Sequence, residues 1–180
     1  MTAAIEIETF DVDRATSHLS GFQEILIDSI EGGGLVGHVV PVDLASIHTY
    51  WLEVVSSIEE GGRILICATV DGELAGTVQL YLSPEANAPH RGEVYKLLVH
   101  RKSRGRGIGE ALMRAVEQEA IKHSRTLLLL DTVQGGVAER LYRRLGWQEI
   151  GTVPKHFVDP WGAFRSSVYM MRSLEPSTSG

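Results

Sequence analysis

The sequence contains a single cysteine, Cys67, among 180 residues. One cysteine cannot form an internal disulfide, and no cluster of cysteine and histidine has zinc-site spacing. Disulfide-stabilised scaffolds and structural zinc domains are therefore excluded, and we expect no metal. Long apolar runs are also missing, since none approaches the roughly 20 residues of a membrane-spanning helix. Residues 1–9 are mixed in character and contain two glutamates, unlike a signal peptide, so we expect a cytoplasmic protein without membrane contact.

Basic residues are outnumbered, with 17 Lys and Arg against 23 Asp and Glu, a formal net charge of −6. This balance argues against sequence-independent nucleic-acid binding, whose affinity comes mainly from phosphate neutralisation by lysine and arginine. Hydrophobic residues make up 43% of the chain, enough for the core of one globular domain. We expect no nucleic-acid partner and a monomer or homodimer, and any anionic ligand must bind a local basic patch.

Hydrophobic periodicity predicts a single mixed α/β domain over residues 1–174, followed by a frayed tail at 175–180. The pattern contains about seven strands and about four helices. The predicted strands are 5–9, 63–70, 73–83, 93–99, 126–130, 147–153 and 167–174, and the predicted helices are 11–31, 44–58, 108–116 and 137–145. The unit from Glu93 to Asp131 reads as a right-handed crossover between two parallel strands.

A basic, glycine-rich turn between that strand and its helix is the most informative segment. Four cations, Arg101, Lys102, Arg104 and Arg106, lie within six residues, which leaves 13 basic against 23 acidic residues elsewhere. Glycines allow close backbone approach to a ligand, and the first turn of a helix presents free N–H groups and the positive end of its dipole. This combination favours binding of a phosphate or pyrophosphate.

Two common phosphate-binding patterns fail on this segment. The dinucleotide pattern needs glycine where the chain has Glu110, and the Walker pattern is absent. The pattern that fits is Arg104-x-x-Gly107-x-Gly109, which resembles the acyl-coenzyme A pyrophosphate loop of the GCN5-related N-acetyltransferase (GNAT) family. The alternative is a glycine-rich connection that only packs helix on strand, with arginines at the surface for solubility.

A second segment extends the resemblance. In that family a later helix carries Asn-x-x-Ala-x-x-x-Tyr followed by Gly-Phe, and this chain has Gly135, Ala138 and Tyr142 followed by Gly146-Trp147. Glycine in place of asparagine removes a side-chain hydrogen bond to the pantetheine arm. The resemblance implies a GNAT-like fold whose splayed parallel strands hold acetyl-CoA as cosubstrate. The implied cofactor-binding residues are Leu98, Val99, Arg104, Gly105, Arg106, Gly107, Ile108, Gly109 and Ala138.

The resemblance also implies direct acyl transfer to an amine. The amine attacks in its neutral form and loses a proton as the amide forms. A carboxylate acting directly or through water can take this proton as general base. Glu93 and Asp131 are the candidates, against the alternatives of a solvated strand end and a turn or cap residue. Tyr142 is the candidate general acid for the leaving thiolate, against the alternative of an ordinary core aromatic residue.

The acceptor is expected to be a small, amino-acid-like amine, because three segments also look similar to the tabtoxin-resistance acetyltransferases of this family. These segments are Gly32–Gly34, Arg91–Gly109 and Asp131–Tyr142. The expected substrate-binding residues are Gly34, His38, Glu93 and Asp131. Two alternatives remain open: acetylation of proteins or peptides, and a non-catalytic acyl-CoA-binding module.

Cys67 lies inside an apolar strand without a neighbouring histidine, so a buried structural thiol is expected rather than an acyl-enzyme nucleophile. Trp161 lies in a segment predicted as a loop, where it either lines a pocket or holds the last strands together.

Overall fold

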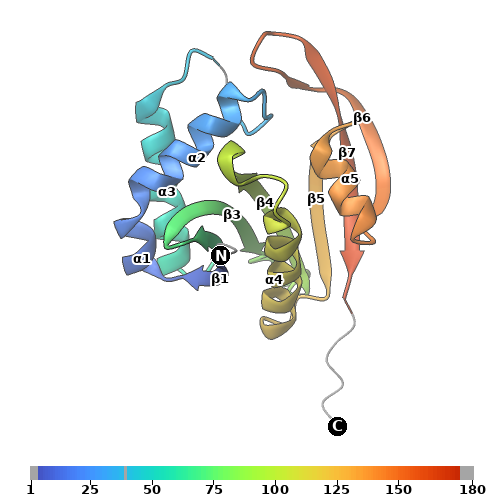
Figure 1. Cartoon of the computed structure of the whole chain (residues 1–180). Helices are drawn as coiled ribbons and strands as arrows, with labels where there is room; N and C mark the ends of the chain where they lie inside the picture. The colour runs from blue at the N-terminus through green and yellow to red at the C-terminus, as the bar shows by residue number, and fades with distance from the viewer. Residues whose placement is uncertain (1–3, 39, 175–180) are drawn as a thin grey trace.

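The computed structural model describes residues 4–38 and 40–174 (Figure 1). The predicted tail at 175–180 lies outside these residues. Seven strands form one mixed sheet in the order β1-β2-β3-β4-β5-β7-β6, which confirms the predicted α/β fold class. The strands are β1 (Ile5–Phe10), β2 (Arg63–Val70), β3 (Glu73–Leu82), β4 (Arg91–Val99), β5 (Leu127–Val133), β6 (Gln148–Val158) and β7 (Phe164–Ser173).

The described residues contain five α-helices, one more than predicted. They are α1 (Val12–Ser17), α2 (Leu19–Glu31), α3 (Leu44–Glu59), α4 (Ile108–Lys122) and α5 (Val137–Arg144). The additional helix arises because the segment predicted as one helix breaks at His18, whose backbone leaves the helical region and whose Nδ1 lies 2.8 Å from the Arg14 carbonyl. Side chains that bond to nearby carbonyls compete with the helix ladder, and the sequence marks this break with neither glycine nor proline.

Helices cover both faces of the sheet, which explains the continuously apolar β2 (Figure 1). Ile64 and Ile66 point into the core shared with α4, while Leu65 and Cys67 point into the core shared with α1, α2 and α3. The face carrying α1 to α3 is called the acceptor face below.

The parallel strands β4 and β5 separate after a short contact, as predicted. Only Arg91–Glu93 pair with Leu127–Leu129, and beyond Glu93 no described strand pairs with β4 on its β5 side. A β-bulge bends β4 at this point: the pairing with β3 shifts between Gln79 and Thr77, and Lys96 has a φ of 51°. The strands therefore start side by side and diverge toward their carboxyl ends (Figure 1).

The last hairpin is longer than predicted. Most of the segment between Pro154 and Arg165, predicted as a loop, extends β6 and β7. Proline is tolerated there because β6 is an edge strand whose register with β7 is irregular between Val153 and Phe157. The extended β6–β7 turn reaches over the opening between β4 and β5, toward the segment that follows α2 (Figure 1).

Candidate active site

The glycine-rich turn forms an open cradle at the start of α4. Arg101–Ser103 make one turn of 3-10 helix, after which Gly105 and Gly107 adopt φ angles of 74° and 80°. A Cβ on either glycine would meet no atom of a described residue within 4 Å. The need for a positive φ therefore explains both glycines, rather than close packing. Gly107 is the N-cap of α4 and gives no side-chain cap, which leaves the first amides of the helix free for an anion.

Two other predicted cofactor-binding residues, Ile108 and Gly109, face the protein interior and contribute to packing. A Cβ on Gly109 would lie 3.2 Å from Leu141 Cδ2, so this glycine allows α4 and α5 to approach. Ile108 is 1% exposed and belongs to the core beneath α4. Any contact of these two positions with a ligand must therefore come from their backbone amides.

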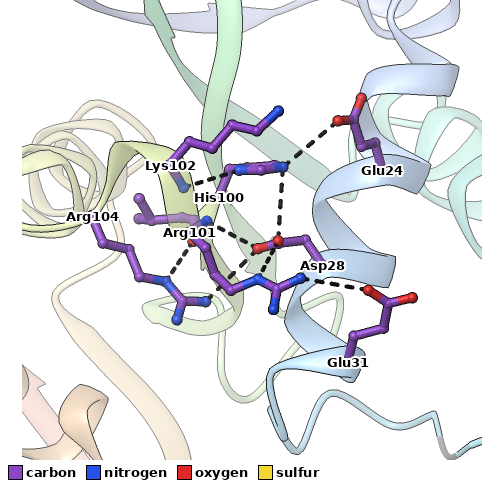
Figure 2. A network of polar contacts seen from close by, with 8 residues as sticks. Glu24, Asp28, Glu31, His100, Arg101, Lys102 and Arg104 are labelled. Carbon is purple, nitrogen blue, oxygen red and sulfur yellow. Dashed lines mark hydrogen bonds and ion pairs between the residues drawn. The ribbon is translucent and has the colours of Figure 1, made fainter.

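The cradle is held by Asp28, a buried carboxylate on α2 that the sequence analysis missed. One oxygen accepts from Arg101 Nε at 2.6 Å, and the other accepts from the Arg101 backbone N–H at 3.0 Å. Figure 2 shows His100 and Arg104 on the same carboxylate, at 3.8 Å and 4.0 Å. Asp28 lies 73 residues before Arg101, so no local pattern could have found the contact.

The charges around Asp28 keep it ionised. Burial alone raises its pKa, but hydrogen bonds from the Arg101 side chain and backbone outweigh burial, and the pKa of Asp28 is lowered overall. Arg101 and Arg104 are thus partly engaged by the protein itself. Lys102 and Arg106 form no ion pair with another described residue, so their side chains are available to phosphate groups.

The predicted pantetheine-binding residues lie on the diverging part of β4. Leu98 is 3% exposed and packs under the acceptor face, while Val99 is partly buried toward α4. The Val99 carbonyl accepts a hydrogen bond from Arg104 Nε at 3.0 Å, which ties the cradle to the strand end. A Cβ on Gly76 of β3 would lie 2.9 Å from the Leu98 carbonyl, so this glycine permits the irregular course of β4.

The start of α5 lies beyond β5 and carries the second motif. Gly135 has a φ of 76°, and its N–H donates to Glu139 Oε2 at 2.6 Å. The turn is therefore fixed by the helix itself, with glycine supplying a left-handed conformation. Ala138 is partly buried against the core.

Glu93 projects from β4 just where β5 departs. It accepts a short hydrogen bond from the Tyr95 hydroxyl, and its other oxygen lies 3.8 Å from Arg91 Nε. Burial and the adjacent Glu93 carboxylate both raise the pKa of Tyr95, so this tyrosine is protonated at neutral pH. Tyr95 was not predicted, and its position two residues after Glu93 on one strand face is the signal that could have found it.

Asp131 does not end its strand, contrary to the prediction. β5 continues to Val133 because β7 pairs with it along its whole length, and Asp131 is paired with Tyr169. Its Oδ2 accepts from Ser167 Oγ at 2.7 Å and lies 3.9 Å from His156 Nε2. Asp131 is thus a half-buried carboxylate on the β5 side of the opening, rather than a cap or turn residue.

Tyr142 lies in the core of the β5 side, with its ring 5.9 Å from that of Trp147. Burial, with a smaller contribution from Asp131, raises the pKa of Tyr142, so its hydroxyl carries a proton at neutral pH. That hydroxyl makes no hydrogen bond to another described residue, whereas Asp131 is near enough to act on it through space.

The segment after α2 forms the rim of the acceptor face. The Gly34 N–H donates to the Ser29 carbonyl at 2.8 Å, and a Cβ on Gly34 would lie 2.4 Å from Ser29 Oγ, so the chain must turn tightly here. His38 borders a cavity of about 370 Å³ and contacts the Tyr50 ring edge-on. Burial, with a contribution from Lys96, lowers the pKa of His38 and favours its neutral form.

Trp161 of the β6–β7 turn reaches this rim from the other side of the opening. A Cβ on Gly33 would lie 2.8 Å from Trp161 Cη2, so the indole packs directly on the glycine backbone. The β6–β7 turn and the segment after α2, which are far apart in the sequence, thus meet across the opening.

A free helix N-terminus, an unpaired strand edge and two carboxylates around one opening define a site suited to group transfer from a phosphorylated donor. The profile of the Acetyltransferase (GNAT) family matches residues 32–147. The chain therefore belongs to this family, and the predicted enzyme class, an N-acetyltransferase, is confirmed.

Individual proteins are similar to the chain at lower levels. Human N-acetylaspartate synthetase is 30% identical over 119 residues, which cover 66% of this chain and 36% of that protein. The match thus spans just over a third of the length of this relative. Among solved structures, a ribosomal-protein-alanine N-acetyltransferase from Brucella melitensis has a TM-score of 0.77 at 23% identity, covering 94% of this chain and 99% of that chain.

A phosphinothricin acetyltransferase from Sinorhizobium meliloti, solved in complex with acetyl-CoA, also has a TM-score of 0.77, at 18% identity. The alignment covers 100% of this chain and 92% of that chain. These likenesses establish the fold. In the described part of the chain, no group of three or more metal-ligating side chains occurs, and no helix is long and apolar enough to cross a membrane.

Proposed function

We propose that the protein transfers the acetyl group of acetyl-CoA directly to the amine of a small, amino-acid-like molecule. The observation that carries this proposal is the convergence of three features at the divergence of β4 and β5. The anion cradle at Gly105–Gly107 fits a pyrophosphate, the unpaired edge of β4 fits the amides of a pantetheine arm, and Glu93 lies where the strands separate.

The proposed reaction needs two proton transfers, and the residues proposed for them lie on opposite sides of the opening. Acetyl-CoA supplies the thioester; the amine nitrogen forms a bond to the carbonyl carbon as the carbon–sulfur bond breaks. Glu93 takes the amine proton, directly or through water, and Asp131 is the second candidate for this role. Tyr142, held protonated by burial, gives a proton to the departing thiolate. Tyr95 holds the Glu93 carboxylate in position.

A small acceptor is favoured over a peptide by the contact between Trp161 and Gly33. This contact joins the β6–β7 turn to the segment after α2 across the opening, which disfavours an acceptor as long as an extended peptide. The similarity to N-acetylaspartate synthetase, whose name denotes acetylation of an amino acid, supports the same class of acceptor. The likeness of Gly32–Gly34 and Asp131–Tyr142 to the tabtoxin-resistance acetyltransferases adds an amino-acid-like toxin as a candidate.

The test is a thiol-release screen with acetyl-CoA over amino acids, amine antibiotics, polyamines and peptides. We expect thiol release with amino-acid-like amines and little with peptides. Binding of acetyl-CoA without thiol release across the panel would indicate a non-catalytic module, and a preference for peptides would indicate the alternative acceptor. Either result would overturn the proposal.

Glu93→Gln tests the proposed base on the best acceptor from the screen. We expect kcat to fall about 100-fold or more, in the range of general-base catalysis, with the Kd for acetyl-CoA within twofold of wild type. Glu85→Gln is the matched control, because the exposed Glu85 also pairs with Arg91, at 3.4 Å, and should leave kcat unchanged. An unchanged kcat in Glu93→Gln removes this residue from the mechanism.

A further inference from the structure

Two cations on the acceptor face, Arg63 and Lys96, have no carboxylate partner among the described residues. Arg63 opens β2, and its register partners across the sheet are Tyr81 and then Glu93. Register partners project on the same face, so Arg63 and the proposed base share one surface of the sheet. Lys96 comes from the bulge of β4, three residues after Glu93.

The side chain of Arg63 is partly buried, and its guanidinium lies near two tyrosine rings. It lies 5.8 Å from the ring centre of Tyr81 and 6.0 Å from that of Tyr95, and its Nη1 donates to Gln79 Oε1 at 2.5 Å. The Nε of Arg63 is buried and has no hydrogen-bond partner among residues 4–38 and 40–174, and the same holds for Nε2 of Gln79, a residue that is fully buried. Such unpartnered donors are costly unless another group satisfies them.

The ammonium of Lys96 points to the same region from the opposite side. It donates to the Val36 carbonyl at 2.5 Å and lies 5.3 Å from the ring centre of Tyr50, whose hydroxyl donates to the same Gln79 oxygen as Arg63. Burial, with a contribution from Arg63, lowers the pKa of Lys96. Lys96 also borders the cavity of about 370 Å³, where the carboxylate of Glu53 is exposed and forms no ion pair with it.

Two part-buried cations near each other repel, and neither forms an ion pair with another described residue, although the Asp131 carboxylate acts on Lys96 from a longer distance. This arrangement is stabilised when an anion binds between them. We propose that Arg63 and Lys96 bind a carboxylate of the acceptor, with Gln79 Nε2 as a further donor. The inference deepens the proposed function: the carboxylate held at Arg63 and Lys96 directs the amine of the same molecule toward Glu93.

The first test compares free amino acids with their α-carboxamides and, for aspartate and glutamate, with asparagine and glutamine. With acetyl-CoA saturating, we expect wild-type kcat/KM to be at least tenfold higher for the acid than for a neutralised form. In Lys96→Met this ratio should fall to about twofold or less. Methionine is unbranched like lysine and close to it in length, and the left-handed backbone at position 96 disfavours both residues alike. Lys122→Met, which removes an exposed charge on α4, should leave the ratio unchanged.

The second test needs no turnover and separates this inference from the proposed function. Calorimetry of the protein saturated with coenzyme A would measure binding of succinate, which has carboxylates but no amine, against succinamide. We expect wild type to bind succinate at least tenfold more tightly than succinamide, and Lys96→Met and Arg63→Met to lose that preference. Absence of thiol release with every amine, together with selective succinate binding, would overturn the proposed function and support the carboxylate site.

The reverse pattern would overturn the carboxylate site alone. This pattern is equal acetylation of the acid and amide forms of an amine, together with succinate binding no tighter than succinamide binding. It would leave the proposed acetyltransferase function standing and show that Arg63 and Lys96 have no role in recognising the acceptor. An acid preference that persists unchanged in both Lys96→Met and Arg63→Met has the same meaning.

Discussion

Asp28→Asn tests whether the anion cradle depends on α2. In wild type both oxygens of this carboxylate, which is 6% exposed, bind Arg101. Asparagine retains one acceptor oxygen and loses the second, and with it the negative charge. Hydrogen bonds to charged groups contribute about 1.5–3 kcal/mol, and the half-exposed side chain of Arg101 reduces this, so we expect the free energy of unfolding to fall by about 1–2 kcal/mol.

Asp28→Asn should also weaken the binding of acetyl-CoA. In Asp28→Asn the side chains of Arg101 and Arg104 are released from α2, so acetyl-CoA must order the cradle when it binds. This ordering costs about as much free energy as the variant loses in stability. We expect the Kd for acetyl-CoA, measured by calorimetry, to rise about tenfold. The melting temperature should fall by about 3–6 °C.

The control is Glu31→Gln, which alters a neighbouring contact to Arg101 that is exposed and 3.5 Å long. It should change stability by less than about 0.5 kcal/mol and leave acetyl-CoA affinity unchanged. Because the folded pKa of Asp28 is lowered, its contribution is present above its unfolded pKa and is lost as pH falls through the folded pKa. The stability difference between wild type and Asp28→Asn should therefore shrink below about pH 4. Acetyl-CoA affinity within twofold of wild type in Asp28→Asn would refute the positioning role.

Three further predictions concern the cofactor loop, the proposed acid and the cysteine. Gly107→Val forces a β-branched residue into a φ of 80° and should both destabilise the protein and weaken acetyl-CoA binding more than tenfold. The control is Gly72→Val in the β2–β3 turn, at a φ of 84° and with equally open space around its Cβ. It should destabilise the protein by a similar amount and leave acetyl-CoA affinity unchanged. Tyr142→Phe should lower kcat at least tenfold with little change in acetyl-CoA affinity, and a kcat equal to that of wild type would refute the acid role. Burial raises the pKa of Cys67 to about 12, so this thiol should resist alkylation at about pH 8 in the folded protein, and rapid alkylation would contradict its burial. Cys67→Ala should keep the kcat of wild type, and loss of turnover would contradict direct transfer.

Sequence reasoning succeeded where the signal is local. The strands predicted at 63–70 and 73–83 and the helix predicted at 44–58 are present as β2, β3 and α3, because the apolar residues of each segment follow the period of that element. It failed where competing contacts are non-local or subtle, as at the break of α1 and α2.

Hydrophobic periodicity by itself determined the mixed α/β class, and the spacing of Arg104, Gly107 and Gly109 determined the anion-binding turn and the family resemblance. These features depend on a few adjacent residues whose backbone and charge requirements can be read along the chain. Only the tertiary structure decided which groups meet: Asp28 beneath the cradle, and Arg63 near Lys96. Each pairing joins separate elements, or depends on the bulge that bends β4. Period-two alternation cannot foresee a bulge that reverses which face a side chain occupies.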